Sequence, residues 1–308
     1  MEKNTGSIKK ATLLYNLKII LTKNLGIKPK ESLLIVHDKK YEKLAKKFLK
    51  IRKASLLKIP NMKINGEEPP KNIAKKFLDY DVIIFLTSKS LSHTKARRDA
   101  TKKGARIASM PGITEPIIKR SIDIDYNKLQ KDSLKYGKIL DKANKITIST
   151  KLGTNLSFSI KGRKAHGLKA GIYNKKSYWG NLPEGEVFIA PVEGTANGKF
   201  IVDGSIAGFG KVKKTIFEVK NGFVTAIAGN KSEEIAKLLS KVGKNSRNIA
   251  EFGIGLNRKA KITGIVLEDE KVYGTCHIAL GNNIGFGGKV NVPLHIDCVI
   301  RNPDILFH

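Results

Sequence analysis

The sequence has few cysteines, few prolines and no long apolar run. Two cysteines in 308 residues cannot build a disulfide framework, which is typical of a reducing compartment. With 10 prolines, 41% hydrophobic and 28% charged residues, the composition excludes a chain that is disordered throughout. The longest apolar segments, such as Val82–Leu86, are far shorter than the ~20 residues of a membrane helix. Since the N-terminal segment also lacks a signal-peptide pattern, we expect a cytoplasmic protein with no membrane partner.

Acidic residues are scarce as well. Lys and Arg number 58 against 27 Asp and Glu, which gives a net charge of +31. Such a chain could be a non-enzymatic nucleic-acid binder, and that alternative predicts clustered arginines with stacking aromatic residues. The sequence offers 49 lysines, only 9 arginines and 7% aromatics. Lysine enrichment is also typical of heat-adapted proteomes, so we expect no specific nucleic-acid partner.

The N-terminal half alternates strand-like and helix-like segments. Short apolar runs, such as Ser32–Val36 and Val82–Leu86, predict buried strands, and Lys40–Ile51 has apolar positions at helical spacing. This alternation predicts a mainly parallel sheet covered by helices. A long helix near Tyr126–Lys142 ends the pattern, so we predict an N-terminal α/β domain over residues 1–143.

The C-terminal half changes character. Short β-rich runs are separated by Gly, Asn and Pro, and Asn221-Gly222 lies between two of them as a hairpin signal. We therefore predict a second domain over residues 144–308, antiparallel-rich and α+β. The expected fold class is α/β, with a parallel-sheet domain followed by this second domain, which carries the chemistry.

The sharpest chemical feature is a His-x-Asp pair. Because side chains alternate along a strand, His295 and Asp297 point to one face while Cys298 points into the opposite, apolar layer. His277 repeats the pattern beside Cys276, so both cysteines are predicted to be core residues. An imidazole and a carboxylate on one strand face can chelate a divalent metal ion, although the pair alone also fits a surface hydrogen bond.

Three glutamates add to this pair. Glu251 begins a segment of small and apolar residues, and Glu184 and Glu186 flank Gly185 just before an apolar run. In a half with few acids, carboxylates in such surroundings are not ordinary solvated charges. Two histidines, one aspartate and two glutamates suit one or two ions such as Zn²⁺, Mn²⁺ or Co²⁺.

Five ordered blocks together strongly resemble the aminopeptidase T family of thermophilic metallopeptidases, in its shorter, leucyl aminopeptidase-like archaeal and bacterial branch. The resemblance spans about residues 30 to 300. The blocks are Ser92–Thr114, Asn181–Ser205, Ala250–Asn257, Gly274–Gly288 and Pro293–Ile300.

This resemblance implies a homodimeric aminopeptidase with two divalent metal ions (Zn, Co or Mn), which removes the N-terminal residue from peptides with a free N-terminus. A metal-bridged hydroxide would attack the first peptide bond, and either Glu184 or Glu251 would move the proton. Longer members place a Tyr a few residues beyond the first His, and this chain has none there. The implied metal ligands are Glu186, Glu251, His277, His295 and Asp297.

The same candidate metal ligands also fit a different reaction. Two histidines and one carboxylate form the ligand set of non-haem Fe(II) oxygenases, and the superfamily resembles the ring-cleaving enzyme 2,5-dihydroxypyridine dioxygenase. That alternative would use His277, His295 and Asp297. A single iron does not need the further carboxylates of Glu186 and Glu251, so the residues on their own favour hydrolysis.

Overall fold

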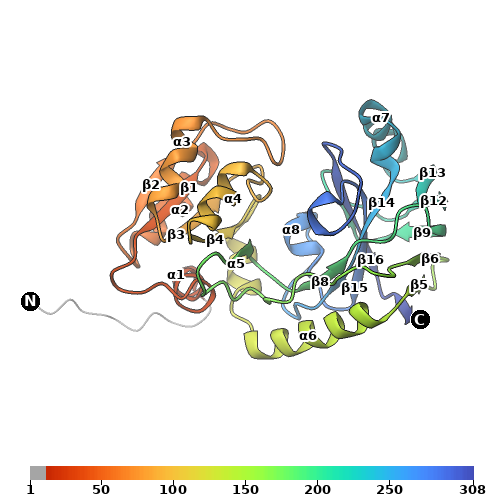
Figure 1. Ribbon diagram of the computed structural model, residues 1–308, viewed down its shortest axis with the longest axis horizontal. Helices are drawn as coiled ribbons and strands as arrows, with labels where there is room; N and C mark the ends of the chain where they lie inside the picture. The colour runs from red at the N-terminus through yellow and green to blue at the C-terminus, as the bar shows by residue number, and fades with distance from the viewer. Residues whose placement is uncertain (1–11) are drawn as a thin grey trace, which may run out of the picture. The chain divides into compact units, whose positions relative to one another are not determined.

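The computed structural model describes residues 12–308, which form two compact units (Figure 1). The first unit consists of the described residues up to Ile124 together with Gly171–Glu184, and the second consists of Asp125–Ala170 and Gly185–His308. Residues 1–11, on which the expected lack of a signal peptide partly depends, lie outside the described residues.

This division differs from the predicted domain boundary between residues 143 and 144. The long helix α6 (Tyr126–Lys142) groups with the second unit, where it packs on strand β8 (Glu186–Ile189). Residues 171–184 return to the first unit because they include strand β7 (Trp179–Asn181), which pairs with the parallel sheet there. The chain therefore crosses between the units more than once.

The first unit contains a parallel five-stranded sheet in the order β2-β1-β3-β4-β7. All residues of its central strands β1 and β3 are buried, as expected for a parallel sheet covered on both faces. Besides β7, the strands are β1 (Leu33–His37), β2 (Ser55–Lys58), β3 (Val82–Leu86) and β4 (Arg106–Ser109). The helices are α1 (Leu13–Ile19), α2 (Glu42–Phe48), α3 (Lys71–Lys76), α4 (Lys95–Lys102) and α5 (Glu115–Ser121).

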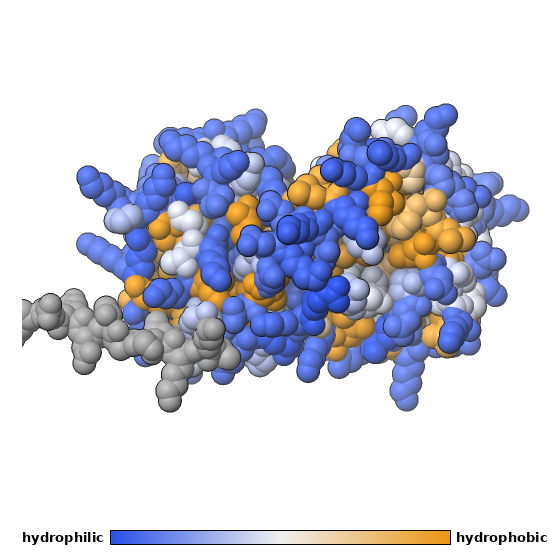
Figure 2. All heavy atoms as spheres, turned by 90° about the horizontal axis from the view of Figure 1, so that it is seen from below, coloured by the Kyte–Doolittle hydropathy of each residue, from blue (hydrophilic) through white to orange (hydrophobic). Residues whose placement is uncertain are grey.

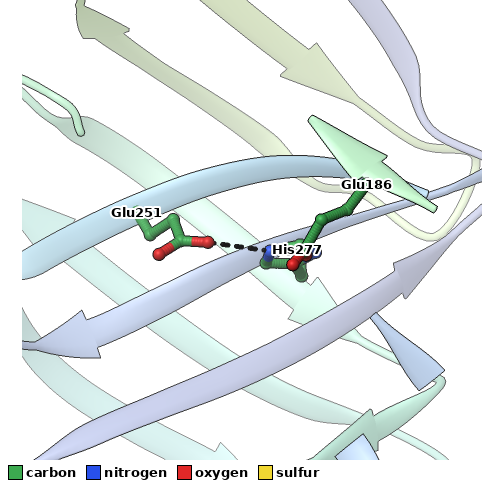
Figure 3. Close-up of side chains that lie close together, drawn as sticks. All are labelled: Glu186, Glu251 and His277. Atoms are coloured by element: carbon green, nitrogen blue, oxygen red, sulfur yellow. Dashed lines mark hydrogen bonds and ion pairs between the residues drawn. The ribbon is translucent and has the colours of Figure 1, made fainter. Parts of the chain in front are cut away.

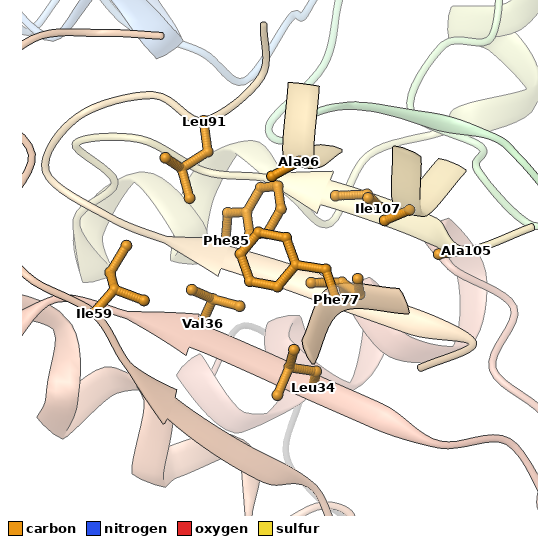
Figure 4. Close-up of a cluster of buried hydrophobic side chains, with 11 residues drawn as sticks. Leu34, Val36, Ile59, Phe77, Phe85, Leu91, Ala96, Ala105 and Ile107 are labelled. Atoms are coloured by element: carbon orange, nitrogen blue, oxygen red, sulfur yellow. The ribbon is translucent and has the colours of Figure 1, made fainter. Parts of the chain in front are cut away.

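One face of this sheet carries a cluster of buried apolar side chains (Figure 4). Alternate residues of neighbouring strands supply it, for example Val36 of β1 and Phe85 of β3. Phe77 packs against Phe85 with ring centroids 5.3 Å apart. The small side chains of Ala96 and Ala100 let helix α4 lie close to the sheet. The predicted parallel α/β arrangement is thereby confirmed.

The second unit contains two antiparallel six-stranded sheets. One has the order β11-β10-β16-β15-β14-β8, with β10 (Ser205–Ile206), β11 (Gly210–Lys211), β14 (Ile249–Gly255), β15 (Thr275–Gly281) and β16 (His295–Arg301). The other has the order β13-β12-β9-β6-β5-β17, with β5 (Lys145–Ser149), β6 (Asn155–Ser159), β9 (Asn197–Val202), β12 (Thr215–Lys220), β13 (Phe223–Gly229) and β17 (Asp304–Phe307). Helices α7 (Ser232–Val242) and α8 (Val266–Asp269) complete the unit.

The predicted fold class is confirmed, since a parallel sheet in one unit accompanies antiparallel sheets in the other. Strands β14 and β15 are buried along their whole length, so polar residues within them are shielded from water. Both cysteines, Cys276 of β15 and Cys298 of β16, are buried as predicted. Within residues 12–308, the helices are too short or too polar to cross a bilayer.

Candidate metal centre

Four adjacent strands, β8, β14, β15 and β16, bring the predicted ligands to one face of a sheet. Glu251 of β14 and Asp297 of β16 both pair with Ala279 of β15, so the small alanine lies between the two carboxylates. His277 lies two residues before Ala279 and therefore shares its face. It pairs with Gly253 of β14. The register of the sheet therefore gathers Glu251, His277 and Asp297, which lie far apart in the sequence.

A first group consists of Glu186, Glu251 and His277, whose ligand atoms lie within 4.8 Å of one another (Figure 3). His277 Nε2 is 3.2 Å from Glu251 Oε1 and 3.5 Å from Glu186 Oε2. The imidazole is fully buried, and both carboxylates are largely shielded from water.

A second group consists of Glu251, His295 and Asp297, again with ligand atoms within 4.8 Å. His295 Nε2 is 3.2 Å from Asp297 Oδ1 and 3.5 Å from Glu251 Oε2. Glu251 therefore belongs to both groups and turns one oxygen towards each histidine. The His295 side chain retains 32% of its accessible surface, so this group is more open to solvent than the first.

These separations fit a bound divalent cation. Two ligands that each lie about 2.1 Å from an ion are about 3.0 Å apart at a right angle and about 3.4 Å apart at the tetrahedral angle. The nitrogen–oxygen distances of 3.2 to 3.5 Å in both groups lie in or just beyond this range. Imidazole and carboxylate donors suit zinc, iron, manganese or cobalt, so both groups are candidate sites for a divalent ion.

Neighbouring backbone orients the two imidazoles. His295 Nδ1 lies 2.8 Å from the carbonyl oxygen of Asn282, so a proton on Nδ1 is donated to that oxygen and Nε2 is left to face the carboxylates. The ring of His277 lies directly against Gly253. A Cβ at position 253 would come within 2.1 Å of His277 Cε1 and 2.2 Å of Nε2, so only glycine leaves room for this imidazole.

The carboxylates make this face strongly negative. Burial lowers the pKa of His277, but Glu251 and Glu186 outweigh it and raise that pKa to about 9. Asp297 and Glu251 likewise raise the pKa of His295 to about 10 against the effect of burial. Burial raises the pKa of Asp297, yet His295 holds it well below its ordinary value. Sites that hold protons this firmly also attract a divalent cation, which competes with those protons.

A buried lysine adjoins the first group. Lys271 is fully buried, and its Nζ donates to Glu186 Oε1 over 2.7 Å and to the carboxylate of Glu270. Burial raises the pKa of Glu270 despite the opposing charge of Lys271. Both residues follow helix α8, and the sequence Glu268-Asp269-Glu270-Lys271 resembles an ordinary solvated run, so sequence reasoning missed them.

Aromatic side chains flank the second group. Phe286 contacts His295 edge-to-face, with ring centroids 5.9 Å apart and planes at 87°. Phe286 also contacts Phe188 at 5.5 Å, and Phe188 stacks on His166 at 5.4 Å. All three of these side chains are half-buried, so part of each ring is accessible. We call Phe286, Phe188 and His166 the aromatic wall.

The structure thus brings together all five residues that the resemblance implies as metal ligands. Neither group contains Glu184, whose carboxylate accepts a 2.7 Å hydrogen bond from the buried Tyr173 hydroxyl, and its catalytic role stays a prediction. The three ligands expected for a single iron, His277, His295 and Asp297, do not form one group among the described residues. Glu251 contacts both histidines instead, because its strand partner on β15 is the small Ala279, which leaves its carboxylate free to reach His277 and His295.

Two solved structures share this fold. A 2,5-dihydroxypyridine dioxygenase from Pseudomonas putida KT2440 superposes with a TM-score of 0.80 at 18% identity, over 97% of this chain and 94% of that one. AmpT from Thermus thermophilus superposes with a TM-score of 0.70 at 14% identity, over 96% and 94%. No curated protein sequence matches significantly.

A family model matches one of the two similar proteins, the dioxygenase. At these identities both superpositions show the fold alone, so the expected membership in the aminopeptidase T family is supported only as a shared fold. A family model covers residues 52–307, which include every residue of both candidate metal-binding groups. The chain belongs to the family described as NicX, 2,5-dihydroxypyridine 5,6-dioxygenase.

Proposed function

We propose that this protein is a non-haem iron(II) dioxygenase that opens a hydroxylated aromatic ring, with 2,5-dihydroxypyridine as the substrate to test first. The family match over residues 52–307 supports this class of reaction. The choice rests on one observation at the site, the aromatic wall beside His295. A flat substrate ring can stack on an aromatic face or contact its edge. The aromatic wall provides such rings next to His295, a candidate metal ligand.

Each residue then has a definite task. Glu251, His295 and Asp297 would hold the ion, in a set that has Glu251 in place of the second histidine usual for such iron. A bound iron(II) would supply the one-electron chemistry by which O₂ reacts with a ring. Asn282 fixes the tautomer of His295 through its carbonyl oxygen. His277 contacts Glu251 from the other side and holds this carboxylate in place.

A second candidate function is metal-dependent removal of N-terminal residues from peptides. The observation that favours it is Glu251, which turns one oxygen towards each histidine as a carboxylate that bridges two ions would. Two ions about 3.5–4 Å apart are typical of aminopeptidases, in which they activate a water molecule. The homodimer and the peptide substrate implied by the aminopeptidase resemblance belong to this second candidate.

One pair of assays separates the candidates. Metal-free protein is loaded anaerobically with Fe²⁺ and given 2,5-dihydroxypyridine, and O₂ uptake is measured with loss of the ring absorbance. The same protein loaded with Co²⁺, Zn²⁺ or Mn²⁺ is given unblocked and N-acetylated peptides, and released amino acids are measured. We expect O₂ uptake that depends on iron, and no release of amino acids.

Variants locate the activity. His295→Ala and Asp297→Asn should each lower metal affinity about 100-fold or more and abolish O₂ uptake, because each removes a ligand. His308→Ala, at a histidine that contacts Thr147 in the other sheet, should behave as wild type. Release of amino acids from unblocked peptides alone, without O₂ uptake, would instead establish the second candidate.

A further inference from the structure

The two candidate groups differ in the positive charge that lies beside their ligands. The first group already contains a fixed cation, because the Lys271 ammonium lies 2.7 Å from Glu186 Oε1 and also contacts Glu270. Glu186 is thereby held between Lys271 on one oxygen and His277 on the other. In the second group, no lysine or arginine forms an ion pair with Asp297 or Glu251 in the part of the chain that the structure describes.

Lys271 cannot easily move away from this position. Its side chain is fully buried, and its backbone carbonyl accepts a hydrogen bond from the amide of Asn257. Its own amide donates to the carbonyl of Glu268 at the end of helix α8. A buried ammonium that lost Glu186 and Glu270 would be left without compensation, so the lysine and both carboxylates stay together.

We propose that Lys271 is a positioning residue that takes the place of a second metal ion and limits the centre to one divalent ion, at Glu251, His295 and Asp297. This inference rests on the proposed metal centre. An ion in the first group would coordinate Glu186 about 2.1 Å from its carboxylate, within a few ångströms of the ammonium, where like charges repel strongly. Lys271 makes no ion pair with the second group and acts there only at longer range, through its charge on Asp297.

Because Glu251 belongs to both groups, the number of bound ions can test the role of Lys271. Glu251 offers an oxygen to each group, so the ligands for a second ion are present, but in the first group the Lys271 ammonium already lies beside them. Removal of the positive charge at position 271 should therefore create a second ion site, whereas a residue with a merely structural role would only lose stability when changed. The number of bound ions is the quantity that distinguishes these cases.

The experiment counts Mn²⁺ ions in the full chain by elemental analysis after dialysis and by EPR spectroscopy. We expect one ion per chain in wild type, with the spectrum of isolated Mn²⁺. Lys271→Met, which keeps the length of the side chain and removes the charge, should bind two ions per chain with an exchange-coupled spectrum. Lys261→Met, at an exposed lysine, should bind one.

Each outcome bears either on the role of Lys271 or on the metal centre itself. Two ions in wild type, or one ion in a folded Lys271→Met, overturn the role of Lys271 and leave the metal centre standing. No ion in wild type overturns the proposed metal centre itself, and the inference with it. If Lys271→Met fails to fold, the number of bound ions is compared between wild type and Lys271→Gln. The glutamine amide has no charge but can still donate a hydrogen bond to Glu186.

Discussion

At the scale of single residues, Gly253 sets the position of His277. Because a Cβ there would overlap the imidazole at 2.1 Å, we expect Gly253→Ala to displace His277 from Glu251. Such overpacking lowers the free energy of unfolding by about 1–3 kcal/mol, and the loss of an oriented neighbour weakens metal binding about 10- to 100-fold. Titration calorimetry with Mn²⁺ measures the affinity, and urea denaturation measures the stability.

A matched glycine provides the control for this substitution. Gly285 has open space around its Cβ position and no left-handed backbone, so Gly285→Ala should leave metal affinity and stability close to wild type. Equal metal affinity in the two variants would show that His277 does not need the room that Gly253 leaves.

Sequence patterns predict some of these residues and miss others for a physical reason. His295 and Asp297 share a strand face, so their two-residue spacing suffices to pair them. Gly253 and Lys271 act on residues more than twenty positions away, through a strand register and a buried ion pair. No local spacing encodes such contacts. An acidic run that ends in lysine, in a half with few acids, is the one signal that could have directed attention to Lys271.

At the scale of elements, the glycine-rich connection between β15 and β16 is attached at one carboxylate. Glu193 accepts hydrogen bonds from the side chain of Asn283 at 2.9 Å and from the amide of Lys289 at 2.8 Å, and it pairs with Arg163 at 2.5 Å. This connection carries Phe286 of the aromatic wall. Glu193 thereby fixes the segment that presents Phe286 to His295.

We expect Glu193→Gln to loosen this segment without unfolding the unit. The neutral amide accepts more weakly and loses the pair with Arg163, which lowers the free energy of unfolding by about 2 kcal/mol. Hydrogen exchange measured by mass spectrometry should rise over residues 283–290 and stay unchanged in β14. The control is Glu234→Gln, whose ion pair with Lys231 is exposed, and it should leave this segment protected.

The same carboxylate predicts a pH dependence. Burial raises the pKa of Glu193, but the Lys289 amide, Asn283 and Arg163 outweigh it and hold that pKa below its ordinary value. A lowered pKa in the folded state stabilises the protein above the unfolded pKa of about 4.3, and this contribution is lost as pH falls through the folded value. The difference in unfolding free energy between wild type and Glu193→Gln should therefore shrink from pH 6 to pH 3 in urea titrations. A constant difference contradicts this assignment.

Elements encoded by local signals are predicted well. The Asn221-Gly222 turn joins β12 and β13, with φ of 49° and 80° as a tight hairpin turn requires. The grouping of α6 with the second unit was not predictable in this way. An amphipathic helix shows that it must pack on something, but its pattern does not say which sheet it covers. Its contact with β8 depends on the tertiary fold.

At the scale of the whole molecule, the net charge of +31 comes mainly from lysine. Figure 2 shows a face covered mostly by hydrophilic residues, in keeping with the 49 lysines of the sequence. Scattered lysines attract nucleic acid without selecting a sequence, and such binding weakens steeply with salt. We expect duplex DNA to be released when salt rises from about 50 to 200 mM in fluorescence anisotropy titrations. Tight binding that persists above this range would support the nucleic-acid alternative.

The division into two units predicts how a metal ion stabilises the molecule. Both candidate groups lie in the second unit, and the single tryptophan, Trp179, lies in the first. An ion at about 100 times its dissociation constant adds about 2.7 kcal/mol to the folded state that binds it. We expect Mn²⁺ to slow hydrogen exchange across β14, β15 and β16, while the unfolding midpoint from Trp179 fluorescence moves much less. Asp297→Asn should show neither effect. Equal shifts by both probes would mean that the two units unfold as one.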